Sequence, residues 1–409
     1  MHQPFSRVQR RVVFACTLAY MAAYCNRFNL SAALEQLGAA LRITPAQAGL
    51  LQTCFAVTYA AGQLVNGMVV DRVKPVRHMV TGVCIACACN MLMGIVAVYP
   101  AMLVFSLLNG AAQSMLWTPI VRLLARFFTE ERQRRRANMI FSFAVVFGHL
   151  AAWAVSGVLA SAVGWRLSFL VPGALGLPCV AVIRALVKYS GESASVHAAA
   201  PASWRAAWPI FARTGLLLVF LASILYGFVR DCIVTWVPTL LSAEGGGSAL
   251  SSTALSLIIP LLNAAGIALG YVLRERENQS NRRVTALMMA CAGLCCVPLL
   301  LVGGALPMAF LMGASCACMY GLNPILTALI PLEYERVGFI ALAAGLMDGF
   351  IYVGSSLAGV AGGALYGTLG ARSMYLCWIL AALAAAALFR LSGWKRFTAS
   401  LDTPDGLPR

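Results

Sequence analysis

Residues 12–37 read VVFACTLAYMAAYCNRFNLSAALEQL, and this stretch decides the class of fold. A helix that crosses the hydrocarbon core of a bilayer needs roughly 20 mainly apolar residues, and this run is long enough. The whole chain repeats the theme, because 61% of its 409 residues are hydrophobic and only 11% are charged. A soluble domain carries about 25% charged residues. A chain this apolar cannot cover a globular surface with polar groups, so we expect a membrane protein.

Eleven further runs have the same length and character, which predicts an all-α membrane protein with twelve transmembrane helices. Strands with open edges are excluded, since backbone groups in lipid must be satisfied within the segment. The predicted spans are 12–37, 46–70, 77–98, 101–125, 136–163, 167–188, 211–241, 250–273, 284–304, 306–330, 337–366 and 371–392.

The charges lie in short loops between these runs. The net charge of +16 is typical of nucleic-acid binding, but no continuous basic face exists, so we expect no nucleic acid as a partner. One set of loops holds most of the lysines and arginines, Arg282 among them, while the opposite set holds only Arg42, Arg166 and Arg372. The positive-inside rule then places both termini and the central loop in the cytoplasm, in a multi-pass protein of the inner (plasma) membrane.

The N-terminus and the cysteines fit this prediction. Met1 to Arg11 is a short basic tail, and the apolar run that follows is too long for a cleavable signal. The 14 cysteines lie mostly inside apolar runs, where cysteine acts as a small apolar residue. We therefore expect no metal, no other cofactor and no enzymatic activity, since no nucleophile or nucleotide motif is visible.

The two halves of the chain repeat at a constant offset of 203 residues. This offset relates Arg27 to Arg230, Arg10 to Arg213, Gly67 to Gly270, Asp71 to Arg274, and Gly110 to Gly313. It predicts two pseudo-symmetric six-helix bundles, at 1–188 and 211–409, joined by a cytoplasmic linker at 189–210. Parallel repeats of this kind place a site near the bilayer midplane, reached alternately from each side.

Arg27 and Arg230 are the strongest candidates for that site. Each lies deep in its predicted span, where an arginine costs about 2.5–3.5 kcal/mol. The guanidinium group is a rigid fork of donors that suits phosphate or carboxylate, so two of them could clamp a divalent oxyanion. The alternative is that each arginine pairs with a helix carboxylate for structure. Asp231 follows Arg230, but neighbours on a helix point about 100° apart, so this pairing is not obvious.

A second group of residues predicts a gate at the cytoplasmic ends. The stretch from Gly67 through Asp71 and Arg72 to Arg77 joins the second and third spans. Its glycine permits close helix packing, and its aspartate can pair with basic groups or a helix N-terminus. Arg122, Arg126 and Glu131, at the end of the fourth span and after it, are assigned to the same gate.

Further polar or aromatic side chains could line the site. Gln113 and Trp117 are four residues apart on one helix face, although helix packing explains them equally well. Asp348 is an intramembrane carboxylate that could balance an arginine or take a proton. The repeat relates Tyr352 to His149, and both could line the cavity, although a lone helix histidine is more often simply packed.

These motifs resemble the major facilitator superfamily, and within it the organophosphate:phosphate antiporters. The resemblance rests on Tyr24 to Asn29, Gln113 to Arg122, Tyr226 to Thr239, and Ala344 to Gly354, and it covers nearly the whole chain. It implies that Arg27 and Arg230 bind the phosphate group, and it adds Tyr24 to the substrate-binding residues. Phe28 and Gln63 stand where the glycerol-3-phosphate transporter has lysines, so this site is less positive.

Three functions follow as expectations. The first is a secondary active transporter that exchanges a small organic anion, such as an organic phosphate, for inorganic phosphate by alternating access. The second is a proton-coupled carboxylate symporter in which Asp231, Asp348 or His149 titrates, since the first two spans also resemble anion:cation symporters. The third is a membrane sensor of an organic phosphate. The expected partners are the anion, phosphate or a proton, and the lipid bilayer, and the expected state is a monomer.

Overall fold

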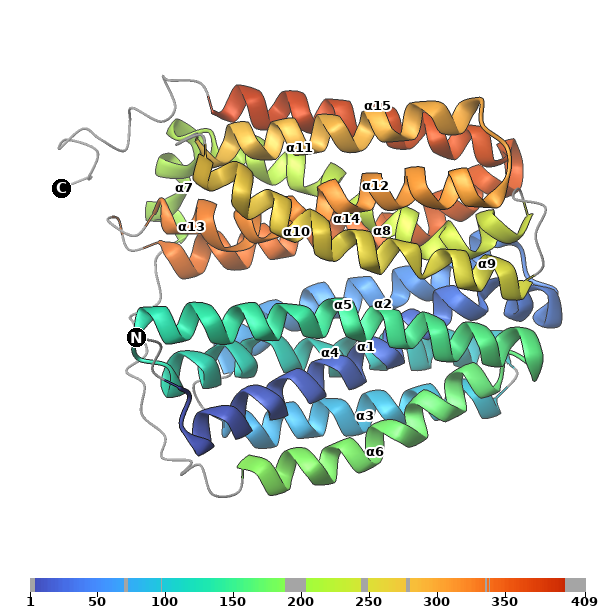
Figure 1. The fold of residues 1–409 in the computed structure, drawn as a ribbon, viewed down its shortest axis with the longest axis horizontal. Coiled ribbons are helices and arrows are strands. Elements are labelled where there is room, and N and C mark those ends of the chain that lie inside the picture. Colours follow the sequence, from blue (N-terminus) through green and yellow to red (C-terminus); the bar gives the residue numbers. More distant parts are fainter. Residues whose placement is uncertain are drawn as a thin grey trace. The chain divides into compact units, whose positions relative to one another are not determined.

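The structure is a computed structural model that describes residues 4–69, 73–96, 98–187, 204–243, 249–276, 280–334, 337 and 339–393. Every regular element in these ranges is helical (Figure 1). The elements are α1 Arg7–Leu41, α2 Pro45–Val69, α3 Pro75–Ile95, α4 Tyr99–Phe127, α5 Glu131–Ala162, α6 Leu167–Val187, α7 Trp204–Arg213, α8 Leu216–Ala243, α9 Ala249–Ser256, α10 Ile258–Arg276, α11 Asn281–Cys296, η2 Val297–Leu300, α12 Ala305–Pro324, η3 Ile325–Leu329, α13 Ile330–Leu332, α14 Ile340–Leu369 and α15 Ala371–Ser392.

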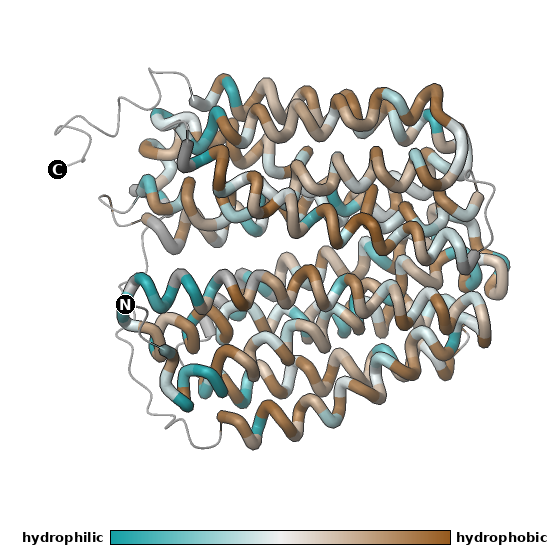
Figure 2. The backbone as a smooth tube through the Cα atoms, in the orientation of Figure 1, coloured by the Kyte–Doolittle hydropathy of each residue, from teal (hydrophilic) through white to brown (hydrophobic). Residues whose placement is uncertain are grey.

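Within the described residues, nine helical stretches are long and apolar enough to cross a membrane. The helices α1, α2 and α4 are not among them, although their lengths of 35, 25 and 29 residues are ample. These three helices carry many of the buried polar side chains of the chain, which lowers their hydropathy (Figure 2). Buried polar groups therefore account for part of the lower hydropathy of α1, α2 and α4.

Several predicted spans are broken. The span predicted at 211–241 begins inside α7 and continues as α8 after Gly215, whose φ of 73° is open to glycine. The span predicted at 250–273 divides into α9 and α10 at Leu257, just before Pro260, which has no N–H to donate. The spans predicted at 284–304 and 306–330 change from α-helix to the 3₁₀-helix η2 and the π-helix η3, next to Pro298 and Pro324. Proline therefore accounts for three of the four departures.

The chain divides into two compact units. Unit 1 comprises Met1–His197 with Ser248–Pro260, and unit 2 comprises Ala198–Gly247 with Leu261–Arg409. Inside unit 1, α1 packs on α5 and α6, and α3 packs on α4 and α6. Inside unit 2, α8 packs on α14 and α15, and α11 packs on α12 and α15. The same pairing of helices in each unit is what the 203-residue repeat predicts.

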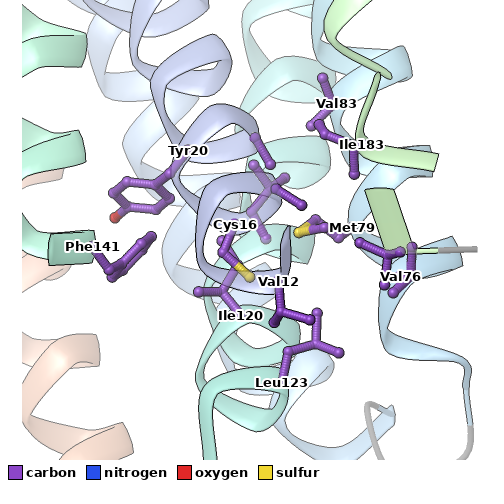
Figure 3. Packing of buried hydrophobic residues seen from close by; sticks show 14 of the residues in the cluster. Val12, Cys16, Tyr20, Val76, Met79, Val83, Ile120, Leu123, Phe141 and Ile183 are labelled. Atoms are coloured by element: carbon purple, nitrogen blue, oxygen red, sulfur yellow. The ribbon is translucent and has the colours of Figure 1, made fainter. Parts of the chain in front are cut away.

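A hydrophobic core fills one end of unit 1, where α1, α3 and α5 begin and α4 and α6 end. It joins side chains from α1, α3, α4, α5 and α6 (Figure 3). Those labelled in the figure are Val12, Cys16, Tyr20, Val76, Met79, Val83, Ile120, Leu123, Phe141 and Ile183. Lipid tails are as apolar as these side chains, so the hydrophobic effect does not drive membrane helices together. Close packing of this kind therefore contributes much of the attraction between them.

Glycines bring certain helix backbones into contact. A side chain at Gly227 of α8 would overlap the carbonyl oxygen of Ile351 in α14, and one at Gly354 would overlap that of Ile224. A side chain at Gly270 of α10 would likewise overlap the backbone of Gly321 in α12. Small residues let membrane helices approach this closely. Gly270 is the residue that the repeat relates to Gly67, whose own close approach stays a prediction.

Candidate functional anion site

Arg27 lies in the interior of α1, 20 residues after Arg7 and 14 before Leu41. Only 7% of its surface is exposed. Its guanidinium carbon lies 5.2 Å from the ring centroid of Phe28, 4.9 Å from that of Phe55 and 5.3 Å from that of Tyr59. Each such cation–π contact stabilises a desolvated cation by about 0.5–2 kcal/mol. Together the rings offset much of the cost of placing this charge in the apolar slab.

Neutral amides surround the same turn of α1. Asn109 donates a hydrogen bond to the backbone oxygen of Asn26 at 2.9 Å, and Gln113 donates to it at 3.3 Å and to the Asn109 side chain at 3.0 Å. Asn29 donates to Asn90 at 3.0 Å, and Asn90 donates to the carbonyl of Phe169 at 3.0 Å. The groups beside Arg27 that these bonds connect are therefore polar but uncharged.

This amide network was missed by the sequence reasoning, apart from Gln113. Asn26, Asn29, Asn90 and Asn109 are each between 1% and 4% exposed. A buried amide within an apolar span is unusual unless it is hydrogen-bonded, so four of them on three predicted spans were a usable signal. Gln113 is buried inside this network, whereas Trp117 is 36% exposed.

A small cavity opens beside Arg27, inside unit 1. It measures about 10 Å³, and its walls come from α1, α2, α3, α4 and α6. The polar lining residues are Asn26, Arg27, Asn29, Gln52, Asn90, Ser106 and Asn109. A water molecule needs roughly 10–15 Å³ by this measure, so the cavity has room for one group of that size.

Arg230 lies at the middle of α8, 14 residues after Leu216 and 13 before Ala243. It forms a two-pronged ion pair with Asp231, with Nε to Oδ1 at 2.6 Å and Nη2 to Oδ2 at 3.2 Å. The sequence reasoning did not foresee this pair. The two Cα–Cβ bonds diverge by about 100°, but the three methylene groups of arginine are long enough to bring the fork back to its neighbour.

Two more groups hold the Arg230 guanidinium. Nη1 lies 3.2 Å from the hydroxyl of Tyr226 and 3.3 Å from the side-chain oxygen of Asn323. The Tyr226 hydroxyl donates in turn to Asn323 at 3.0 Å. Its guanidinium carbon also lies 5.1 Å from the ring centroid of Tyr226. The arrangement around Arg230 therefore matches the structural alternative, in which the arginine pairs with a carboxylate.

The aromatic candidates of unit 1 form one packed row. The ring of Tyr24 lies 5.0 Å from that of Phe28, and Phe28 stacks on His149 at 4.1 Å. His149 is 1% exposed and also contacts the edge of Trp153 at 4.3 Å. The structure therefore places Tyr24 and His149 in contact with Phe28, whose ring also contacts the Arg27 guanidinium.

Trp117 belongs to a second group of rings. It lies 6.0 Å from Tyr20 and 5.9 Å from Phe141. Because Tyr20 lies 5.0 Å from Tyr24, this group is continuous with the row next to Arg27. Gln113 and Trp117 thus have different surroundings, one in the amide network and one among rings.

In unit 2, Tyr352 is 9% exposed and Asp348 is half-buried, both on α14. Of the predicted gate residues, Asp71 and Arg72 lie outside the described residues, as does the side chain of Glu131. Arg122 and Arg126 are half-buried near the end of α4, and Arg126 lies 5.7 Å from the ring of Phe127. The roles assigned to these residues stay predictions.

The prediction that Arg282 is a loop charge is wrong, because Arg282 lies in α11. Its side chain is fully buried. It donates to the backbone oxygen of Ser392 at 2.8 Å and to that of Thr214, to the Glu333 carboxylate at 3.2 Å, and to the Tyr334 hydroxyl at 3.1 Å. Burial raises the pKa of the Tyr334 phenol, so it stays a hydroxyl at neutral pH. Arg282 thus ties together the ends of α7, α11, α13 and α15 in unit 2.

The fold and these intramembrane charges define a multi-pass α-helical membrane transporter. A model of the Major Facilitator Superfamily matches residues 16–341. The chain belongs to this family, whose fold has twelve membrane helices in two six-helix bundles, and α1, α2 and α4 complete the twelve with the nine apolar stretches. The three relatives described next are membrane transporters and not enzymes.

Curated relatives come from several bacteria. The chain is 25% identical over 286 residues to the "Probable sulfoacetate transporter SauU" of Cupriavidus necator, covering 66% of each chain. It is 26% identical over 163 residues to the "Probable hexose phosphate transport protein" of Chlamydia muridarum, covering 40% of this chain and 36% of the relative. It is 23% identical over 273 residues to the glycerol-3-phosphate transporter of Bacillus subtilis, covering 61% of each. The match spans less than two thirds of each of these relatives.

Solved structures agree on the fold. An inward-facing, occupied bacterial homologue of the human lysosomal transporter Spinster matches with a TM-score of 0.73 and 17% identity, covering 95% of this chain and 97% of that one. The nucleoside transporter NupG matches with a TM-score of 0.69 and 14% identity, covering 94% of this chain and 98% of that one. At such identities the likeness shows the fold alone.

Proposed function

We propose that this protein is a secondary active transporter of the inner membrane that moves a small organic anion, an organic phosphate exchanged for inorganic phosphate. The observation that carries the proposal is Arg27, a buried guanidinium in the interior of α1 that lies against three aromatic rings. The guanidinium is a rigid, planar fork of donors that matches the oxygen atoms of a phosphate or carboxylate, so an anion that reaches the interior of α1 can be bound by it.

The names of the relatives support an anionic cargo. Sulfoacetate, hexose phosphate and glycerol 3-phosphate are the substrates in the three names given above, and each is a small organic anion. A further relative, 26% identical over 169 residues, is the membrane sensor UhpC of Salmonella typhimurium. Phosphate esters account for two of the three cargoes, which favours the phosphate exchanger.

Arg230 supplies the second guanidinium of the proposed clamp once the cargo has displaced the Asp231 carboxylate from it. In the present structure Asp231 occupies two of its donors. A doubly charged cargo that reaches both arginines exchanges with this carboxylate, so binding replaces one anion by another and leaves no buried cation without a counter-charge. We propose that the carboxylate holds the arginine while the site is empty.

A counterflow experiment tests whether uptake of the anion is coupled to the exit of inorganic phosphate. Proteoliposomes loaded with inorganic phosphate are given labelled phosphate esters, carboxylates or phosphate itself on the outside. The proposal predicts that internal phosphate drives rapid uptake of a phosphate ester and that an uncoupler leaves this uptake unchanged. Uptake that ignores internal phosphate and collapses with the uncoupler contradicts the exchange mechanism.

The Arg230–Asp231 pair also favours a second candidate, proton-coupled carboxylate symport. Protonation of Asp231 would remove the charge that holds the guanidinium and so release Arg230 for the anion. In symport, a proton on Asp231 releases Arg230. In exchange, the negative charge of the cargo displaces Asp231 from Arg230 instead.

Replacement of the carboxylate distinguishes the two mechanisms. Asp231→Asn is expected to lower the apparent KM for the anion about tenfold, because the cargo no longer competes with a charge-assisted internal bond. Under exchange, phosphate-driven counterflow persists in the variant, whereas under symport the dependence of uptake on the pH gradient is lost.

Glu35→Gln is the matched control, since Glu35 is an exposed carboxylate on α1. An unchanged KM in Asp231→Asn would show that the carboxylate is not displaced and that the pair has only a structural role.

A further inference from the structure

The short helix α7 is separate from the long helix α8 that follows it. The ring centroids of Phe211 in α7 and Phe220 in α8 lie 6.0 Å apart. In one straight α-helix these two residues would be about 13.5 Å apart along the axis and on opposite faces, because nine residues make about 2.5 turns. The contact therefore requires the chain to fold back between them, at Gly215, whose φ is 73°.

The inner face of α7 packs against the rest of unit 2. Ala207 and Phe211 are fully buried, and Thr214, just after the helix, is 1% exposed. Spacings of four and three residues place these positions on one face. The Phe211 ring also lies 5.3 Å from that of Tyr334, and Arg282 donates to the backbone oxygen of Thr214. This face fixes α7 at the end of unit 2 where α13 lies (Figure 1).

The outer face of α7 combines one aromatic side chain with two cations. Arg205, Trp208, Pro209, Ala212 and Arg213 are all exposed, and their spacing places them on one face, opposite the buried one. Trp208 is 44% exposed. Such a face is typical of a helix that lies in a membrane interface, where tryptophan sits at the level of the headgroups and basic side chains meet anionic lipids.

The charge of this face indicates which lipid it suits. The sequence of α7, WRAAWPIFAR, contains two arginines and no carboxylate. Arg205 and Arg213 are about 12 Å apart along the axis, with Trp208 between them. A zwitterionic headgroup carries its own cation and so gains less from two arginines than an anionic headgroup does.

We propose that the outer face of α7, made by Arg205, Trp208 and Arg213, is a binding site for the headgroups of anionic phospholipids such as phosphatidylglycerol. Trp208 enters the interface beside the lipid chains, and the arginines donate hydrogen bonds to the lipid phosphates. The bound lipid thereby anchors the end of α8, the helix that carries Arg230. This site does not depend on the cargo, so it goes beyond the proposed function.

Quenching by brominated lipids tests the proposal. The full-length protein is reconstituted in bilayers of phosphatidylglycerol with excess phosphatidylcholine, with bromine on the acyl chains of one lipid or the other. Bromine quenches the fluorescence of tryptophans that it contacts, and the difference between wild type and Trp208→Phe isolates Trp208 among the eight tryptophans. We expect a binding preference of about fivefold for phosphatidylglycerol at Trp208, which is the effect of one arginine beside an anionic surface.

The double variant Arg205→Gln with Arg213→Gln is expected to lose this preference, so that both lipids quench Trp208 in proportion to their amounts. The single variant Arg213→Gln replaces it if the double variant does not fold. The matched control is Arg42→Gln with Arg166→Gln, which removes the same charge from two other exposed positions and is expected to keep the wild-type preference.

Three results would overturn the proposal. Trp208 that neither lipid quenches means that the outer face of α7 meets water or another protein. Quenching of wild type in proportion to the two lipids means that α7 touches the bilayer without selecting charge. A preference that survives the substitutions at Arg205 and Arg213, or that is also lost in the control, means that these arginines do not form the site.

Discussion

Arg27→Lys is expected to lower the initial rate of anion uptake at least about 100-fold while the protein still inserts in the membrane. Lysine keeps the positive charge but lacks the planar fork that donates two parallel hydrogen bonds to an oxyanion. It also loses the broad contact with the rings of Phe28, Phe55 and Tyr59. The measurement is uptake of labelled anion in cells, normalised to the amount of protein in the membrane fraction.

The same substitution at Arg166 provides the control. Arg166 is exposed and lies 5.3 Å from the ring of Trp165, so it shares one kind of contact with Arg27 but not its burial. Arg166→Lys is expected to transport at close to the wild-type rate. Robust uptake by Arg27→Lys would refute the role of this guanidinium as the anion site.

Arg282→Met is expected to destabilise the protein by about 1–3 kcal/mol, which is the usual effect of leaving a buried hydrogen-bonding group without its partner. The substitution leaves the Glu333 carboxylate and the backbone oxygens of Thr214 and Ser392 without the donor that now joins them. The measurement is the melting temperature of the purified protein in detergent.

Arg283→Met is the matched control, because Arg283 is the next residue and is exposed. Its melting temperature is expected to stay near that of the wild type. A similar melting temperature for the two variants would mean that the buried cluster does not hold the ends of the unit 2 helices together.

Much of the fold follows from hydropathy, because a run of about 20 apolar residues in lipid has few alternatives to a helix. The breaks at Leu257 and around Gly215 were not predicted, since an apolar run looks the same on both sides of a break. Pro260 was the available signal for the first, but many membrane helices tolerate proline, as α6 does at Pro172.

The site was predictable only in part. The repeat pointed to Arg27 and Arg230, and the structure places both in the interior of long helices. The pairing of Arg230 with Asp231 was missed because it depends on the conformation of a long side chain, which no spacing rule describes. Arg282 was misplaced because its neighbours in sequence are loop residues, and its partners Thr214, Glu333 and Ser392 are distant in the chain.

The central claim is that one anion is bound by the guanidinium groups of both Arg27 and Arg230. A double-mutant cycle on the dissociation constant of inorganic phosphate, with Arg27→Lys, Arg230→Lys and the double variant, tests it most directly. The claim predicts that each single variant weakens binding and that the double variant is scarcely weaker than either. Losses that simply add, or a normal affinity in Arg230→Lys, would contradict it.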